Sequence, residues 1–212
     1  MVFVDAPPAT GLTTVLNEVG SKRPEWDVRT NTARGGSDKQ AFNFVRTLFA
    51  ETECADGLRW FLTEMSERLL REEPERLLAA TPQVILVERT IEQVELVAKA
   101  FGDCALLSVD AMDSIGEIVF ELGQREEQAG WAGWSRRVVH IDVSPTEALD
   151  RLGAKNQTGY HEVSEKFYGA YEYRLNKSMN YDHYVDGDKS AKSVADDLIR
   201  AIEDFVREES TY

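Results

Sequence analysis

Short apolar runs alternate with longer amphipathic segments along this chain. Residues 2–4 and 83–87 are almost continuously apolar, as in strands buried on both faces. Residues 26–30, 137–141 and 182–186 predict three further strands. Five strands separated by helices indicate parallel strands joined by right-handed crossovers. We therefore expect one α/β domain over residues 1–212, a three-layer α/β/α sandwich with a five-stranded parallel sheet.

Helical periodicity fills the stretches between these strands. Leu12, Val15, Leu16 and Val19 form one apolar stripe, and Gly20 is a typical stop signal. Pro145 after Ser144 predicts another helix start. The polar stretch 153–160 predicts a lid-like loop. Further helices are predicted over 40–80, 91–101, 112–128, 145–152, 162–175 and 191–206.

Composition narrows the classes of partner. The net charge of −14 argues against free nucleic-acid binding, although it leaves room for a small basic pocket. No stretch approaches the roughly 18 apolar residues of a membrane span. Cys54 and Cys104 form no CxxC pair, so we interpret both as reduced thiols. Because the first predicted strand begins at Val2, we expect a cytoplasmic-type reducing compartment, or an organelle if a presequence has been removed.

The loop after the first strand resembles a phosphate-binding motif. Residues 6–13 read A-P-P-A-T-G-L-T, against the Walker A or P-loop pattern G-x-x-x-x-G-K-[ST]. Gly11 and Thr13 match, whereas Ala6 replaces the first glycine and Leu12 replaces the lysine. The motif is therefore degenerate. Backbone N–H groups from Ala9 through Thr13, including those of Thr10 and Gly11, are nevertheless expected to bind phosphate. The structural alternative is that Leu12 simply belongs to the apolar stripe.

A charged pair follows the apolar run at 83–87. Glu88 and Arg89 are expected at the carboxyl end of a strand, beside the first loop, where open α/β sheets bind ligands. There Glu88 is a candidate Mg²⁺ ligand or acceptor of a hydroxyl proton, and Arg89 a candidate phosphate ligand. The structural alternative is a helix N-terminal glutamate and a surface arginine.

Several stretches, in the right order, resemble the deoxynucleoside kinase family. Residues 84–90 (V-I-L-V-E-R-T) resemble its E-R-S signature, and residues 2–6 resemble the strand that leads into its P-loop. Further likeness lies in residues 56–60, 138–145, 148–151 and 161–175. The resemblance implies a P-loop kinase fold and ATP-dependent, Mg²⁺-dependent phosphorylation of a nucleoside 5′-hydroxyl. It places Thr13 on Mg²⁺ with Glu88, and Lys155 over the transferred group.

The chain departs from this family at residues that carry the chemistry. Leu12 stands at the lysine, and Asn31 falls near the general-base carboxylate. Glu64 or Met65 falls near the base-reading glutamine. Lys155 and Gln157 fall near the lid arginines. The missing lysine and the missing base would each cost two or more decades in rate.

Two hypotheses follow. The first is a (deoxy)nucleoside or nucleotide kinase with an atypical phosphate loop, in which Lys155, Arg34 or Arg89 supplies the missing charge and Glu88 or Asp5 the base. The second is a catalytically inactive kinase-fold protein, an accessory subunit of a larger complex. The expected partners are ATP, Mg²⁺ and a nucleoside or nucleotide, with a homodimer or a larger assembly left open. His140 is interpreted as a core or edge residue of its strand, and the tyrosines at 168, 171 and 173 as packing or surface residues.

Overall fold

The computed structural model describes residues 1–8, 10–30, 84–104, 135–154 and 164–210, together with 113, 115–117, 119–120 and 124. Five of the predicted helical segments lie wholly or mostly in these ranges. The predicted helices over 40–80 and most of 112–128 lie outside the described residues, as does Cys54. Cys104 is a buried free thiol.

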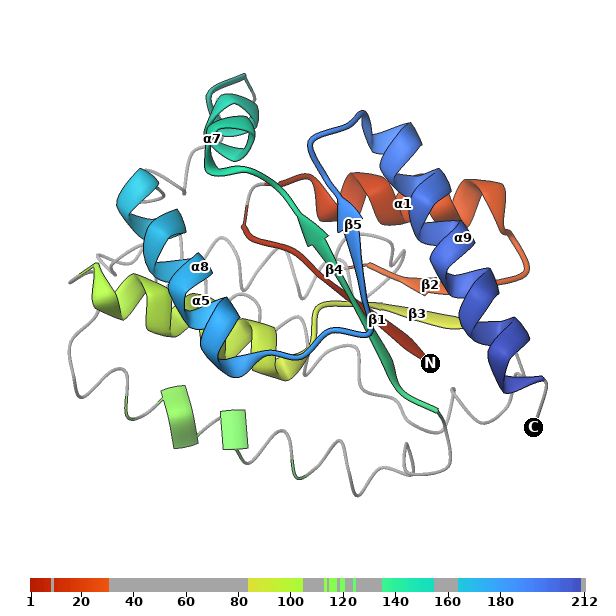
Figure 1. The fold of residues 1–212 in the computed structure, drawn as a ribbon, viewed down its shortest axis with the longest axis horizontal. Helices are drawn as coiled ribbons and strands as arrows, with labels where there is room; N and C mark the ends of the chain where they lie inside the picture. The colour runs from red at the N-terminus through yellow and green to blue at the C-terminus, as the bar shows by residue number, and fades with distance from the viewer. Residues whose placement is uncertain are drawn as a thin grey trace, which may run out of the picture.

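A five-stranded parallel sheet forms the middle layer, as predicted (Figure 1). Its order is β2-β3-β1-β4-β5, so each neighbouring pair requires a crossover. The β1 strand lies at the centre, paired with β3 on one side and β4 on the other. The strands are β1 (Val2–Asp5), β2 (Asp27–Arg29), β3 (Ile85–Glu88), β4 (Arg137–Asp142) and β5 (His183–Asp186).

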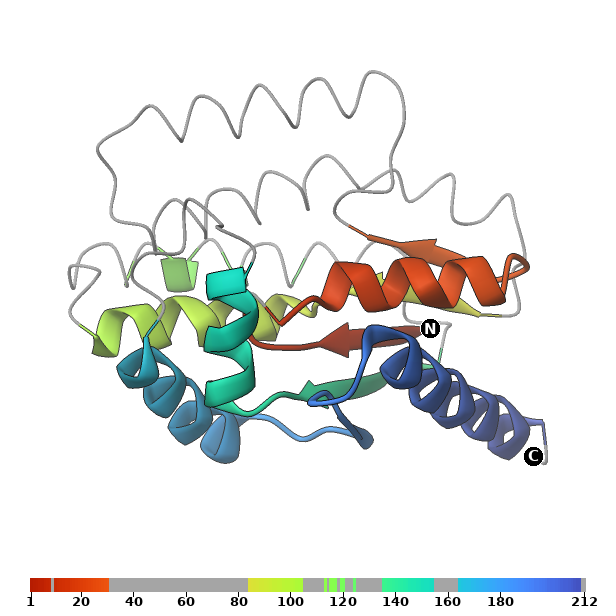
Figure 2. The same cartoon turned by 90° about the horizontal axis from the view of Figure 1, so that it is seen from above.

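Helices cover both faces of the sheet. Figures 1 and 2 show α1 (Leu12–Lys22) beside α9 (Ala191–Glu209) on one side, and α5 (Ile91–Asp103) beside α8 (Glu165–Ser178) on the other. The α7 helix (Pro145–Ala154) lies beyond the carboxyl end of β4. Buried apolar side chains from the strands and these helices form a continuous core. The arrangement is the three-layer sandwich that the pattern predicted.

Several element boundaries differ from the sequence prediction. The α1 helix continues through Gly20 to Lys22, because a glycine weakens a helix without necessarily ending it. The α7 helix includes Gly153, so the predicted loop at 153–160 starts too early. The α8 helix begins at Glu165, where the Ser164 side chain caps it by accepting from the N–H of Phe167.

No helix among the described residues is long and apolar enough to cross a membrane.

Candidate functional site

The carboxyl ends of β1 and β3 bring the first loop and the E-R-T stretch together. Val4 of β1 pairs with Glu88 of β3, and the N–H of Arg89 donates to the carbonyl of Val4 at 2.9 Å. Successive side chains of a strand point to opposite faces. Asp5 and Glu88 therefore leave this edge on opposite sides of the sheet, Glu88 toward α1 and Asp5 toward α5.

Glu88 contacts the first turn of α1. The hydroxyl of Thr13 donates to Glu88 Oε1 at 2.8 Å across a sequence separation of 75 residues. The Glu88 side chain is 1% exposed. A hydroxyl and a carboxylate are hard oxygen ligands of the kind that Mg²⁺ takes beside substrate phosphates. The two residues assigned to the metal from the sequence thus lie in contact.

Arg89 lies at the same strand end in an unusual backbone conformation. Its φ is 63°, a left-handed value that non-glycine residues adopt rarely. Its guanidinium Nη1 lies 3.8 Å from Glu88 Oε1, and the side chain is almost fully buried. Such backbone strain persists only where the surroundings enforce it, and it concentrates at functional sites. Arg89 is therefore a buried cation beside Glu88 and not the surface arginine of the structural alternative.

Asp5 is engaged in holding the start of α5. Its carboxylate accepts from the Thr90 N–H at 2.6 Å and from the Thr90 hydroxyl at 2.8 Å. Thr90 in turn caps α5 by accepting from the N–H of Gln93 at 3.0 Å. Burial raises the pKa of Asp5 to about 6, although the Thr90 hydrogen bonds oppose the shift. Asp5 is fully buried, and both of its carboxylate oxygens accept hydrogen bonds from Thr90. This arrangement favours a structural role for Asp5 over the role of a substitute general base.

Side chains from other elements hold the carbonyl groups of the first loop. Gln93 Nε2 donates to the carbonyl of Ala6 at 3.0 Å, and the Tyr168 hydroxyl donates to that of Pro8 at 2.9 Å. Within the loop, the Thr10 hydroxyl donates to the carbonyl of Pro7 at 2.7 Å. The loop therefore has a defined path that requires no lysine side chain.

The first turn of α1 follows a glycine in the left-handed conformation. Gly11 has φ 87° and provides no side-chain cap for the helix. Leu12 is 3% exposed and packs in the core with Val15, Leu16 and Val19. The apolar stripe predicted from the sequence is therefore present.

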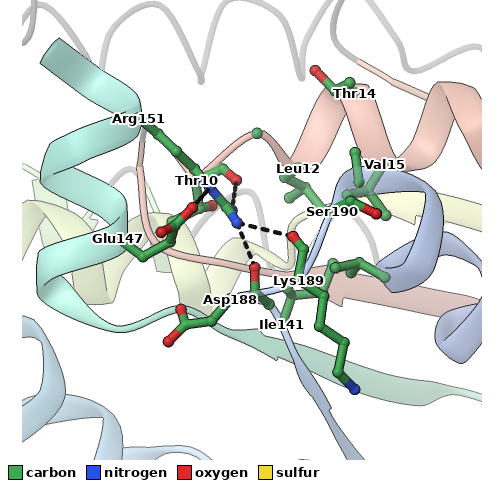
Figure 3. A pocket seen from close by; sticks show the side chains of 14 residues that line it. Thr10, Leu12, Thr14, Val15, Ile141, Glu147, Arg151, Asp188, Lys189 and Ser190 are labelled. Carbon is green, nitrogen blue, oxygen red and sulfur yellow. Dashed lines mark hydrogen bonds and ion pairs between the residues drawn. The ribbon is translucent and has the colours of Figure 1, made fainter. Parts of the chain in front are cut away.

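A cavity of about 380 Å³ opens beside this turn (Figure 3). Its walls come from the turn between Thr10 and Val15, from β4, from α7, and from the segment that joins β5 to α9 together with the start of α9. This volume lies in the range of small-molecule sites. The wall residues are Thr10, Gly11, Leu12, Thr14, Val15, Ile141, Glu147, Arg151, Gly187, Asp188, Lys189, Ser190, Ala191 and Val194.

Arg151 is the residue of this cavity that sequence reasoning missed. It extends from α7 to the Thr10 carbonyl at 2.8 Å and pairs with Glu147 at 2.7 Å (Figure 3). The i,i+4 spacing of Glu147 and Arg151 is visible in the sequence, but it predicts only a surface helix pair. The long-range contact with Thr10 depends on the crossover from β4 into α7, which the sequence pattern does not position in detail.

A second polar cluster lies on the α5 and α8 side of the sheet. Gln93 Nε2 donates to the Tyr171 hydroxyl at 2.7 Å, and the Tyr181 hydroxyl donates to Gln93 Oε1 at 3.3 Å. Burial raises the pKa of Tyr171 well above its ordinary value. His140 packs against Tyr181 with ring centroids 4.7 Å apart. Tyr168, Tyr171 and His140 are buried and Tyr173 is exposed, in agreement with the structural roles predicted for them.

Of the predicted site residues, Thr13 and Arg89 both contact Glu88. Thr10 and Gly11 instead line the cavity, whose wall includes none of these three residues. Several predicted residues lie outside the described part of the chain, and their roles stay predictions. They are Ala9 and Lys155 of the phosphate site, together with Asn31, Arg34, Glu64, Met65 and Gln157.

No protein-family model and no curated protein matches the sequence. Among solved structures, the chain is similar to the deoxyadenosine kinase of M. mycoides with bound dATP, with a TM-score of 0.58 and 12% identity over 95% of this chain and 98% of that one. A second structure of that kinase, with dCMP and dCDP as products, gives a TM-score of 0.60 and 11% identity over 96% and 98%. At this identity the likeness concerns the fold. The chain has the P-loop kinase fold of these nucleoside kinases.

Proposed function

We propose that this chain is a (deoxy)nucleoside or nucleotide kinase that transfers a phosphoryl group from ATP to a hydroxyl of its acceptor. The observation that carries the proposal is the 2.8 Å contact between the Thr13 hydroxyl and buried Glu88. Thr13 comes two residues after Gly11, which lines the cavity together with Thr10. The fold shared with deoxyadenosine kinase supports it. Burying the carboxylate of Glu88 costs free energy of folding, and a functional role would explain why the chain keeps it there.

Each described site residue then has a role that its position permits. Thr13 and Glu88 would hold Mg²⁺, which supplies charge neutralisation at the transferred phosphoryl group when bound. The backbone of Thr10 and Gly11, with Ala9, would bind phosphate oxygens at the start of α1. The alternative role for Glu88 is to accept the acceptor's hydroxyl proton in place of holding Mg²⁺, because both Asp5 oxygens accept hydrogen bonds from Thr90.

The degenerate Walker A loop sets the main energetic problem of this proposal. Leu12 brings no ammonium, and one charged transition-state contact is worth about 3 kcal/mol. Arg89 is the first proposed substitute for the lysine charge, because its guanidinium is a buried positive charge at the same strand end as Glu88. Lys155 stays the second proposed source of positive charge.

The test is direct phosphorylation by the purified chain. Radiolabelled ATP and Mg²⁺ are incubated with deoxyadenosine, deoxycytidine, the other nucleosides and the nucleoside monophosphates, and labelled product is separated. Glu88→Gln is expected to lower the rate about 100-fold, through loss of a charged metal ligand. Glu92→Gln is the matched control, because Glu92 is an exposed glutamate that pairs with Arg136 at 2.9 Å.

No observation on the described residues favours the accessory-subunit alternative, which enters as one outcome of this assay. Absence of product with every acceptor, together with absence of ATP binding by calorimetry, would refute the kinase proposal. Product formed equally well by Glu88→Gln would refute the role assigned to Glu88.

A further inference from the structure

Arg151 joins three separate parts of the chain around the cavity. It lies in the last turns of α7, and its Nη1 donates to the carbonyl of Thr10 at 2.8 Å. Its Nη2 donates to the carbonyls of Gly187 at 2.8 Å and Lys189 at 3.1 Å. Its Nε donates to Glu147 at 2.7 Å. The guanidinium therefore makes four hydrogen bonds within the protein.

These contacts bridge opposite walls of the cavity. Thr10 precedes α1, whereas Gly187 and Lys189 lie between β5 and α9 (Figure 3). The Lys189 ammonium extends away from this contact, toward Asp186 at 3.4 Å and Asp197 at 3.0 Å. Only the backbone of the β5–α9 segment is therefore held by Arg151, and the separation of the two walls depends on one planar group.

Arg151 also fixes the orientation of one peptide group. The C=O and N–H of a trans peptide lie in one plane and point in opposite directions. Because the Thr10 carbonyl is bound to Arg151, the N–H of Gly11 is directed away from α7. Tyr168 holds the Pro8 carbonyl two residues earlier in the loop. The loop backbone is thus oriented from outside at two points.

We propose that Arg151 is a positioning residue for the triphosphate donor: it sets the width of the donor cavity and the orientation of the Thr10–Gly11 peptide. The inference rests on the proposed function and adds a residue that neither the motif nor the E-R-T stretch contains. A lysine could reach one carbonyl with a point charge, but it lacks the planar fork that holds three at once. Donor binding therefore depends on the guanidinium shape as well as on its charge.

The experiment measures donor and acceptor binding separately. Fluorescent N-methylanthraniloyl-ATP with Mg²⁺ reports on the donor, and calorimetry with 2′-deoxyadenosine or the best acceptor of the phosphorylation assay reports on the acceptor. The variants are Arg151→Met and Arg151→Lys. Arg200→Gln is the control, because it removes an exposed arginine of α9 that pairs with Asp197. Thermal unfolding confirms that each variant is folded.

Both Arg151 variants are expected to lose about tenfold or more in donor affinity, since the cavity is no longer preorganised. Acceptor affinity is expected to stay within about twofold, and Arg200→Gln is expected to bind both ligands normally. If Arg151→Met does not fold, Arg151→Lys decides the question alone, because it keeps the charge that Glu147 faces.

Three results would overturn the inference. These are unchanged donor affinity in a folded Arg151 variant, full rescue by lysine, and an equal loss for donor and acceptor, which would indicate a general effect on the fold. Failure of the unaltered chain to bind ATP would instead remove the proposed function, and the inference with it.

Discussion

Replacing His140 with phenylalanine is expected to change how the stability of this protein depends on pH. His140 is fully buried in β4, and neither ring nitrogen has a hydrogen-bond partner among the described residues. Its ring packs between Tyr181 at 4.7 Å, Tyr184 at 5.8 Å and Tyr171 at 6.4 Å. Burial lowers its pKa to about 4. The fold therefore requires the neutral imidazole.

The direction of the effect follows from proton binding. Between about pH 6.5 and pH 4 the unfolded chain protonates this histidine while the native chain does not, so acid favours unfolding. From the pKa of about 4, the loss between pH 7 and pH 5 is about 2 kcal/mol. Asp5 acts in the opposite direction. Because the pKa of Asp5 is about 6 in the native state, the native chain binds a proton at a higher pH than the unfolded chain does. Between pH 7 and pH 5 this raises the free energy of unfolding by about 1 kcal/mol.

Urea unfolding of the unaltered chain and of His140→Phe, at pH 7 and pH 5, measures the difference. At pH 7 the variant is expected to be no less stable, because it keeps an aromatic ring and removes two unbonded polar atoms. At pH 5 its advantage is expected to grow by about 2 kcal/mol. A His140→Phe difference that is the same at both pH values would refute the burial argument.

Four further substitutions test other features of the structure. Thr90→Val removes one of the two donors to buried Asp5 and the cap of α5, so the free energy of unfolding in urea should fall by about 2–3 kcal/mol; an unchanged midpoint would contradict this. Gly187→Ala would place Cβ 2.4 Å from Val143 Cγ2 and should lower the melting temperature, whereas Gly169→Ala, with open space around it in α8, should raise it slightly. Leu12→Lys should increase ATP affinity about tenfold, because a lysine can bury its stem while its ammonium reaches the cavity, and an unchanged or weaker titration would refute that placement.

The sheet and its helices could be predicted from the sequence because their signals are local. A strand that is buried on both faces gives a continuous apolar run, and a helix that is buried on one face gives a stripe such as that at positions 12, 15, 16 and 19. Element ends were less predictable. Gly20 reads as a stop signal, yet α1 continues through it to Lys22, because a glycine inside a helix costs only about 1 kcal/mol relative to alanine.

One contact of the candidate site could be predicted for the same reason. Thr13 and Glu88 were predictable neighbours, because Glu88 ends one strand, Thr13 lies in the helix after another, and the ends of neighbouring parallel strands meet at one edge of the sheet. Arg151 and Gln93 were not, because their partners are backbone carbonyls of the first loop, 141 and 87 residues away. Any residue type provides a carbonyl, so such contacts leave no pattern in the sequence of the loop they hold.

The side chains that bind the loop carbonyls also explain why the loop can keep its conformation with leucine at position 12. Leu12 occupies a packing position of α1, where burial of its side chain contributes about 2 kcal/mol to folding. The loop conformation depends instead on Gln93, Tyr168 and Arg151, which bind its carbonyls from three other segments. Loss of a loop ammonium therefore removes charge without removing the loop's shape. On the proposed function, a cation elsewhere at this edge, such as Arg89, would supply the missing charge to a backbone that is already in place.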